Sequence, residues 1–296
     1  MEGIVDAHHH VWRLNDLEWL KGPTQPRIFG EYQAIKRDYL IEDFTRDLEG
    51  SGVEQSVYIQ VNWPPHEELL EAEWVQNISN KNGWPHAFVG YVDFGAEDAK
   101  ATLRKLNTFP LMRGIRQQLH WHENPQYCFQ STPDLMNQSA WQRNFSLIQE
   151  YGWSFELQVF ASQMKNAARF ASDFPEIPMI LQHCGMPEDT SKVGMNSWRD
   201  GMTRLAERPN VHCKFSGLGT FIHRNDPNFI ADITGECIEM FTTDRCLYGS
   251  NFPIEKIWAE YGSIVNAFLK ATAELSEADQ ESIMRNNAMR LYRLDH

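Results

Sequence analysis

The chain has 296 residues, 42% of them hydrophobic and 12% aromatic, which is enough for a large core in one α/β barrel or in two ordinary domains. Its formal net charge of −13 argues against a nucleic-acid partner, because phosphate backbones bind clustered positive charge. No run of about 18 apolar residues predicts a membrane span, and the acidic start lacks the basic segment of a secretory signal, so we expect a cytoplasmic protein.

Short apolar, β-branched runs alternate with longer segments of helical periodicity, which is typical of parallel α/β folds. The predicted strands span 3–10, 55–61, 88–93, 112–117, 154–160, 179–183, 211–216 and 246–250. The predicted helices span 41–49, 67–79, 96–107, 139–151, 162–172, 199–207, 227–241, 264–275 and 277–292. Eight strands with crossover helices, and no Gly/Ser-rich or Pro-rich linker, predict an α/β fold: a single (β/α)8 TIM barrel over residues 1–296 with long loops at its C-terminal face.

The first predicted strand carries three consecutive histidines near its end. Because alternate side chains of a strand share a face, Asp6, His8 and His10 are expected to project together and to bring two imidazoles to one point. The alternative is a histidine-rich terminus left by a purification tag or simply solvated. The apolar residues at 4–5 and 11–12 that flank the run favour a built site.

Polar side chains also lie at the ends of most other predicted strands, where a barrel of this type places its active site. They are Gln60, Asn62, Arg116, Gln118, Glu156, Gln158, His183, Lys214, Ser216 and Asn251. Buried polar groups are costly unless they pair, so packing alone explains this concentration poorly. A structural interpretation is open for some of them: Gln60 and Gln158 could satisfy one another, and Lys214 could pair with Glu156, leaving neither directly catalytic.

Three long predicted loops, at 11–39, 118–138 and 184–198, combine aromatic rings with hydrogen-bonding groups suited to enclosing a polar organic ligand. These residues are Trp12, Trp19, His120, Trp121, His122, Tyr127 and Trp198. Each could equally pin its loop to the rim of the barrel. The five cysteines are scattered without a C-x-x-C pair, so we expect reduced, mostly buried thiols, and we favour burial over a nucleophilic role for Cys184.

Six ordered motifs resemble the amidohydrolase superfamily, and more narrowly its branch of TIM-barrel hydrolases that contains 2-pyrone-4,6-dicarboxylate lactonase and sugar-acid lactonases. The motifs are D-A-H-H-H-V-W at 6–12, M-R-G-I-R at 112–116, I-L-Q-H-C-G-M-P at 180–187, K-F-S-G at 214–217, Y-G-S-N-F-P at 248–253 and N-A-M-R-L-Y at 287–292. The resemblance implies a hydrolase that opens a lactone or related ester of a small anionic or polyhydroxylated ring by water attack at the barrel mouth.

The departures from the superfamily pattern affect the expected mechanism. In the superfamily, an aspartate on the eighth strand accepts the proton of the attacking water, and here Asn251 stands in its place. The fourth strand offers Arg116 and no lysine for a carbamate bridge, and the fifth offers Glu156 and Gln158 where a histidine ligand might be expected. The resemblance therefore does not extend to a binuclear metal centre.

Two mechanisms remain open. In one, a single Zn²⁺ held by His8, His10 and His183 lowers the pKa of a bound water. In the other, which we favour, no metal is required: the same histidines bind the ester and the water, and Glu156 or His183 is the base. The expected catalytic residues are His8, His10, Glu156, His183 and Asn251. The expected substrate-binding residues are Gln60, Arg116, His120, Trp121 and Lys214.

Two other function classes stay open at this stage. One is metal-dependent non-oxidative decarboxylation of an aromatic or muconate-type acid, which Asn251 and the missing fifth-strand histidine disfavour. The other is a barrel that binds a ligand without turning it over. The expected partner is a small-molecule substrate, with no nucleic acid and no membrane, and a homo-oligomer is neither predicted nor excluded.

Overall fold

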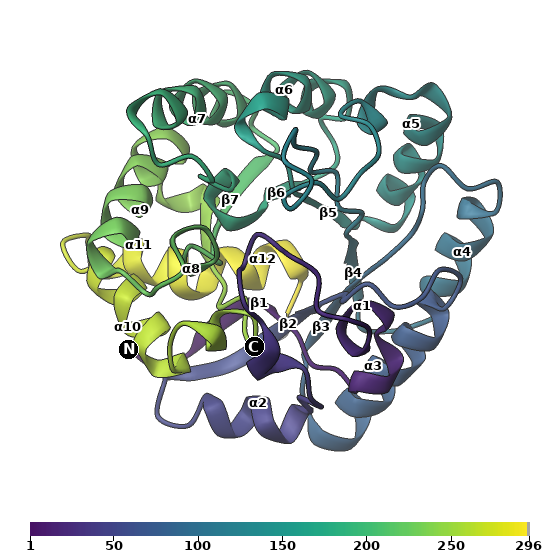
Figure 1. Cartoon of the computed structure of the whole chain (residues 1–296), viewed down its shortest axis with the longest axis horizontal. Coiled ribbons are helices and arrows are strands. Elements are labelled where there is room, and N and C mark those ends of the chain that lie inside the picture. Colours follow the sequence, from purple (N-terminus) through teal and green to yellow (C-terminus); the bar gives the residue numbers. More distant parts are fainter. Residues whose placement is uncertain (295–296) are drawn as a thin grey trace.

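The computed structural model describes residues 1–294 and places eight parallel strands in one sheet, in the order of the sequence (Figure 1). The strands are β1 (Ile4–His9), β2 (Val53–Ile59), β3 (Ala87–Gly90), β4 (Met112–Ile115), β5 (Ser154–Leu157), β6 (Met179–Leu181), β7 (Val211–Phe215) and β8 (Cys246–Tyr248). Each overlaps a predicted strand. The assignment of residues 1–296 to one domain stays a prediction, and residues 295 and 296 lie outside the described part.

Helices follow the strands and surround the sheet, so that each parallel crossover passes over the outside of the barrel (Figure 1). They are α1 (Glu18–Lys21), α2 (Ile41–Asp47), α3 (Glu68–Asn82), α4 (Ala99–Leu106), α5 (Ser139–Phe145), α6 (Met164–Asp173), α7 (Lys192–Ala206), α8 (Gly219–Ile222), α9 (Pro227–Phe241), α10 (Tyr261–Ala271), α11 (Glu277–Glu281) and α12 (Asn287–Tyr292). A π-helical segment, Ser282–Asn286, joins α11 to α12 where one helix was predicted. No helix in residues 1–294 has the length and apolar character needed to cross a membrane.

Local sequence accounts for several helix starts. The Asp226 side chain accepts hydrogen bonds from the amides of Asn228 and Phe229 and is followed by Pro227 in the first turn of α9. Ser276 caps α11, because its side chain accepts a hydrogen bond from the amide of Asp279.

The sheet closes between β1 and the segment after β8. A parallel bridge pairs His9 with Phe252, and the amide of His10 donates to the Phe252 carbonyl at 2.8 Å. The amide of Asn251 donates to the carbonyl of His8 at 2.7 Å. Closure therefore sets Asn251 beside the first-strand histidines, and the predicted (β/α)8 barrel is confirmed.

The inside of the barrel is apolar at the end where α12 covers it. Side chains of the strands form one cluster with α12, which includes Val5, Ala7, Ile59, Val89, Ile180, Leu247, Ala288 and Tyr292. The larger cluster fills the layer between the strands and the surrounding helices. Burial of these layers holds the strands in place and leaves the opposite end of the barrel for the site.

The prediction that Asp6 projects together with His8 and His10 is wrong. The pairing of β1 with β2 shifts register between Asp6 and His9, which is a bulge that turns the following side chains. The Asp6 carboxylate faces α10, where it accepts hydrogen bonds from the Tyr261 hydroxyl at 2.9 Å and from Ser250. Asp6 thus ties β1 to β8 and α10.

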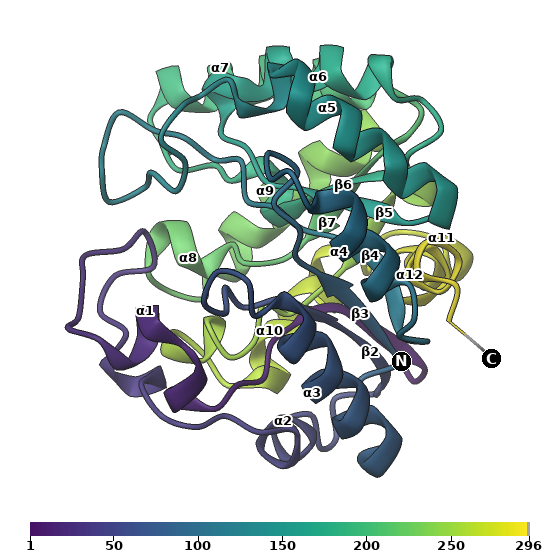
Figure 2. The ribbon, with the colours of Figure 1, turned by 90° about the vertical axis from the view of Figure 1, so that its right-hand side faces the viewer.

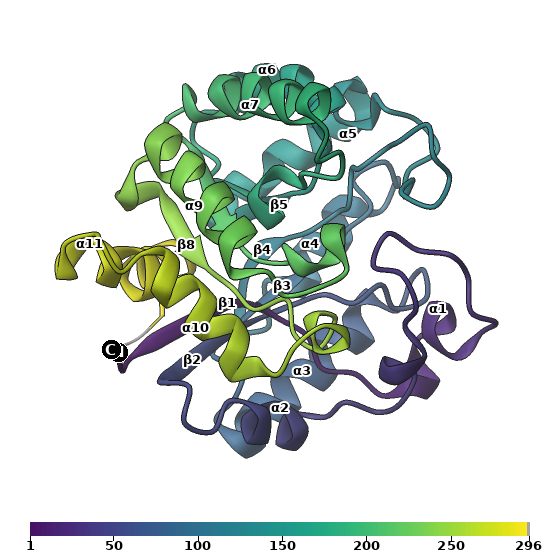
Figure 3. The same ribbon diagram turned by 60° about the vertical axis from the view of Figure 1, so that its left-hand side comes forward.

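The long loops gather at one end of the molecule, and the N-terminus and the last described residues lie at the other (Figures 2 and 3). The segment that contains α1 and the loop after β4 extend beyond the barrel on the same side. This end carries the carboxyl ends of the strands, as the barrel architecture requires.

Candidate active site

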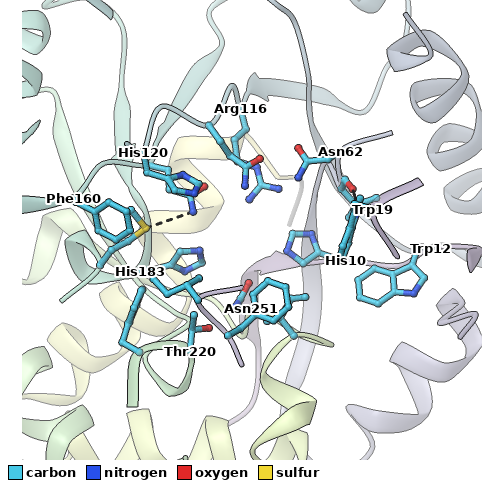
Figure 4. A pocket seen from close by; sticks show the side chains of 18 residues that line it. His10, Trp12, Trp19, Asn62, Arg116, His120, Phe160, His183, Thr220 and Asn251 are labelled. Atoms are coloured by element: carbon cyan, nitrogen blue, oxygen red, sulfur yellow. Dashed lines mark hydrogen bonds between the residues drawn. The ribbon is translucent and has the colours of Figure 1, made fainter. Parts of the chain in front are cut away.

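A cavity opens at the carboxyl ends of the strands and has a volume of about 650 Å³, part of it open to solvent (Figure 4). Its wall combines residues that follow β1, β2, β4, β5, β6, β7 and β8 with the long first loop. They include His10, Trp12, Trp19, Phe29, Asn62, Arg116, Gln118, His120, Gln158, Phe160, His183, Thr220 and Asn251. The size is that of a small-molecule site. Of the loop residues expected to enclose a ligand, Trp12, Trp19 and His120 line the cavity, whereas Trp121, His122, Tyr127 and Trp198 do not.

The structure brings His8, His10 and His183 together. The ring of His8 lies 5.0 Å from that of His10 and 4.8 Å from that of His183, measured between ring centroids. His10 and His183 line the cavity, whereas His8 lies behind them. Nδ1 of His10 lies 2.7 Å from the carbonyl of Ile59, which can only accept, so this nitrogen carries a proton and Nε2 has a lone pair.

Burial keeps these three imidazoles neutral. It lowers the pKa of His10 to about 3, with the nearby Arg116 as the next cause. Burial also lowers the pKa of His8 and of His183 well below the usual value, with Lys214 and Arg116, respectively, as the next contributions. At neutral pH these imidazoles are therefore uncharged, and each keeps a nitrogen lone pair that can accept a hydrogen bond or bind a metal.

Backbone strain marks two of the site segments. His183, Cys184 and Met186 all have left-handed backbone conformations with φ between 51° and 56°, and Asn251 has φ of 57°. Such conformations are costly for residues other than glycine and persist where surrounding structure holds them. They turn the chain sharply after β6 and β8, and the Nδ1 atom of His183 then meets the Ser216 hydroxyl at 2.9 Å.

Arg116 supplies the cation of the cavity wall. Its guanidinium donates to the carbonyl of Gln60 and lies 3.5 Å from the side-chain oxygen of Gln182, while its Nε makes no hydrogen bond within residues 1–294. Burial lowers the pKa of Arg116 to about 10, so the group stays charged at neutral pH. It is fixed in place with donor capacity left for a ligand.

Glu156 and Lys214 pair with each other below the cavity and do not line it. The Lys214 ammonium also donates to the carbonyl of Ala7 at 2.8 Å, and the Glu156 carboxylate accepts from Gln182 at 3.0 Å and from the Tyr292 hydroxyl. Both side chains are fully buried. The geometry does not favour Glu156 as the base or Lys214 as a substrate ligand, and it confirms the ion pair that the sequence left open.

Gln60, an expected substrate ligand, does not line the cavity, and several polar atoms of residues that do line it have no partner among the described residues. Gln60 donates to the Arg116 carbonyl and to Asn62, and Gln158 donates to the sulfur of Met186, so the suggested Gln60–Gln158 pair is wrong. The side-chain oxygens of Gln118 and Gln158 and Nδ1 of His120 have no partner among the described residues. Burial lowers the pKa of His120 to about 3. These neutral groups can bind ligand hydroxyls.

One further expectation differs from the geometry, and one agrees with it. Trp121 does not line the cavity, and its amide donates to Gln163 in the loop after β5. Cys184 is buried away from the cavity together with Cys213, Cys237 and Cys246, as expected for core thiols.

Sequence reasoning missed Glu255, a buried carboxylate in the loop after β8. It accepts hydrogen bonds from the amides of Gly219 and Thr220 and from the Thr220 hydroxyl, and it contacts the side chain of Asn251. The only feature of the sequence that could have indicated Glu255 is its position four residues after Asn251, at the end of the eighth strand.

The three histidines fit a single divalent metal by donor type. Nε2 of the buried His8 makes no hydrogen bond to any described residue, and the His10 Nδ1 contact with a carbonyl is the arrangement that frees Nε2 for a ligand. Among residues 1–294, the only set of three potential ligand atoms within 4.8 Å of one another is the thiol group of Cys184, Cys213 and Cys237, so the imidazoles would have to draw closer around an ion. The preference for a metal-free site is not supported.

Comparisons with known proteins agree with this architecture. The amidohydrolase family model matches residues 5–294. The uncharacterized protein y4mH of Sinorhizobium fredii is 34% identical over 293 residues, which cover 98% of each chain. An L-fucono-1,5-lactonase of Burkholderia ambifaria is 25% identical, with 98% of this chain and 96% of that protein covered.

A solved structure of an amidohydrolase from Burkholderia multivorans with bound zinc has a TM-score of 0.84 at 20% sequence identity, and the match covers 99% of both chains. This likeness shows a common fold. Together, the family match over nearly the whole chain and the 34% identical relative show that this chain is a hydrolase that belongs to the amidohydrolase family.

Proposed function

We propose that the protein hydrolyses the lactone of a sugar acid or of a similarly polyhydroxylated acid. The observation that carries this proposal is the composition of the cavity: neutral imidazoles beside one guanidinium, with unpaired polar atoms of Gln118, His120 and Gln158 along the wall. An uncharged, hydroxyl-rich ring would supply the missing partners of these groups.

The charges favour a polyol over a dicarboxylate. Lys214 is sealed by Glu156 beneath the cavity, so Arg116 is the one Lys or Arg side chain among the described residues that line it. The guanidinium already donates to Gln60 and lies next to Gln182, so only some of its donors face a ligand, and no second cation of the cavity wall would bind a second carboxylate. The 25% identical relative named L-fucono-1,5-lactonase supports the same class of substrate.

The chain's own residues can perform the hydrolysis. Arg116 stabilises the negative charge that develops on the carbonyl oxygen as water adds to the lactone carbon. His183, neutral and fixed by Ser216, accepts the proton of that water and returns it to the ring oxygen when the carbon–oxygen bond breaks. The product is the open-chain hydroxy acid, and no further reactant is needed.

As an alternative, His8, His10 and His183 would hold a divalent metal, which when bound supplies Lewis-acid polarisation and a water of lowered pKa, and His183 would then be a ligand and not the base. Trp12, Trp19 and Phe160 line the cavity, limit the access of water and offer faces to the ring. His10, fixed by the Ile59 carbonyl, orients groups at the floor of the cavity.

The test is hydrolysis of a panel of five- and six-membered aldonolactones, followed by a pH indicator and by NMR of the products. Protein treated with chelator and protein reconstituted with zinc are both assayed against the same panel and against 2-pyrone-4,6-dicarboxylate. Turnover of sugar lactones supports the proposal. Preference for the dicarboxylate would contradict the substrate class, and binding without product would indicate a non-catalytic barrel.

A further inference from the structure

Glu255 is held from three sides at the edge of the site. Its Oε1 accepts from the Thr220 amide at 3.1 Å and from the Thr220 hydroxyl at 2.9 Å, and its Oε2 accepts from the Gly219 amide at 3.0 Å. The side chain is 4% exposed and does not line the cavity. Three donors fix the carboxylate, which leaves little freedom in its remaining contact, with Asn251.

The contact with Glu255 determines which way the Asn251 amide points. Both oxygens of Glu255 already accept hydrogen bonds from Gly219 and Thr220, so Asn251 meets acceptors and offers its NH2 group and not its carbonyl oxygen. A second observation agrees with this orientation. A β-carbon placed at Gly217 would lie 3.1 Å from the nitrogen of the Asn251 side-chain amide, so this nitrogen is on the Gly217 side. The NH2 group thus faces the segment between β7 and α8, and the carbonyl oxygen faces away from it.

Asn251 lies between His10 and His183, two of the histidines that line the cavity, as Figure 4 shows. The Asn251 side chain contacts His10. The β-carbon placed at Gly217 would also lie 2.5 Å from Nδ1 of His183, so His183 and the Asn251 amide are both next to Gly217. The Asn251 atom near Gly217 is the amide nitrogen, so the carbonyl oxygen lies on the opposite side, toward the cavity that Asn251 lines, where it can accept a hydrogen bond from a water. It orients the water without taking its proton, because a neutral amide is not a base at neutral pH.

We propose that Glu255 is a positioning residue which, through the side-chain amide of Asn251, presents an acceptor oxygen to the attacking water. This inference rests on the proposed function for its catalytic consequence. The carboxylate that the eighth strand lacks is thus replaced by two side chains: Asn251 orients the water, Glu255 holds Asn251, and the proton goes to His183.

The kinetic test compares Glu255→Gln with wild type. The Gln side chain has the same shape as Glu, but one carboxylate oxygen becomes an NH2 group, which donates. One of the groups that donate to Glu255, or the Asn251 amide, therefore loses its acceptor. We expect kcat to fall on the order of 10-fold while KM stays unchanged. In the Asn251→Ala background the same change should have no further effect, because the amide through which it acts is gone.

Glu71→Gln is the matched control. Glu71 is 1% exposed, and burial raises its pKa to about 7, as it does for Glu255, but it bonds Tyr58 and Val61 and not Asn251. Thermal unfolding of each variant reports the structural cost. An unchanged kcat in Glu255→Gln would overturn the proposal. It would also be overturned if the losses of kcat caused by Glu255→Gln and by Asn251→Ala added in full in the double variant.

A measurement on the wild-type protein covers the case in which Glu255→Gln does not fold. The side-chain amide signal of Asn251, assigned by its loss in Asn251→Ala, should show one proton protected from exchange, as expected for a hydrogen bond to a carboxylate. Fast exchange of both protons would overturn the contact. If no lactone is hydrolysed, the proposed function fails, yet this signal still tests the pair Glu255–Asn251.

Discussion

The Lys214 ammonium lies 2.8 Å from both carboxylate oxygens of Glu156, inside the barrel and out of contact with solvent. This pair spans β5 and β7, and the hydroxyl of Tyr292 from α12 closes it from below. Two charges that would otherwise suggest a general base and a substrate ligand are therefore part of the barrel interior. Their effect on activity should pass through the stability of the fold.

Glu156→Gln leaves the Lys214 ammonium buried without a carboxylate. We expect the free energy of unfolding to fall by about 3–5 kcal/mol, because an unpaired buried charge is costly. The double variant Glu156→Gln/Lys214→Met should recover most of this loss. Urea denaturation measures both. If Glu156 were instead the base, the single variant would keep its stability and lose turnover.

His183→Asn tests the proposed base. We expect kcat/KM for a hydrolysed lactone to fall at least about 100-fold, the usual contribution of general base catalysis. His212→Asn is the control, since His212 is buried on β7 outside the cavity. Equal losses in the two variants would mean that folding, and not proton transfer, is affected.

Elemental analysis of protein prepared without a histidine tag tests the imidazole set. If the three histidines form a zinc site, wild type should retain about one zinc per chain, and His8→Asn/His10→Asn should lose it. Cys213→Ser separates this site from the buried thiol cluster, and it should leave the zinc content unchanged. Loss of zinc in the cysteine variant alone would place the metal in the core.

The low pKa of His120 gives stability a pH dependence with a definite sign. The folded protein holds His120 neutral down to about pH 3, whereas the unfolded chain protonates it below about 6.5. The stability that depends on neutral His120 is therefore fully present above pH 6.5 and is lost as the pH falls from 6.5 toward 3. Between pH 8 and pH 5, wild type should lose on the order of 2 kcal/mol relative to His120→Gln in urea denaturation. A constant difference would contradict the buried, neutral state.

The order of the strands and the end of the barrel that carries the site could be predicted from the sequence. Apolar β-branched runs alternating with helical segments specify parallel crossovers, and in such a barrel the strand ends converge. His10, Arg116, His183 and Asn251 lie where this rule places them. Family resemblance added the chemistry that these residue types serve.

The depth of each polar side chain could not be predicted in the same way. Glu156 and Gln158 stand two residues apart on one face of β5 and its extension, yet the first is sealed beneath the cavity and the second lines it. Strand parity assigns a face of the sheet but not a height along the barrel axis. That height depends on the stagger between neighbouring strands, which no local pattern encodes.

By itself, the sequence determined a closed parallel barrel with histidines, an arginine and an asparagine at its mouth, because local periodicity and strand count are enough for that. The amidohydrolase type came from the resemblance of its motifs. Only the tertiary structure decided that Asp6 turns outward at a bulge, that Glu156 belongs to Lys214, and that Glu255 stands behind Asn251. These are contacts between residues far apart in the chain or across an irregular turn, and their free energy depends on burial and partner geometry, which exist only once the barrel has closed.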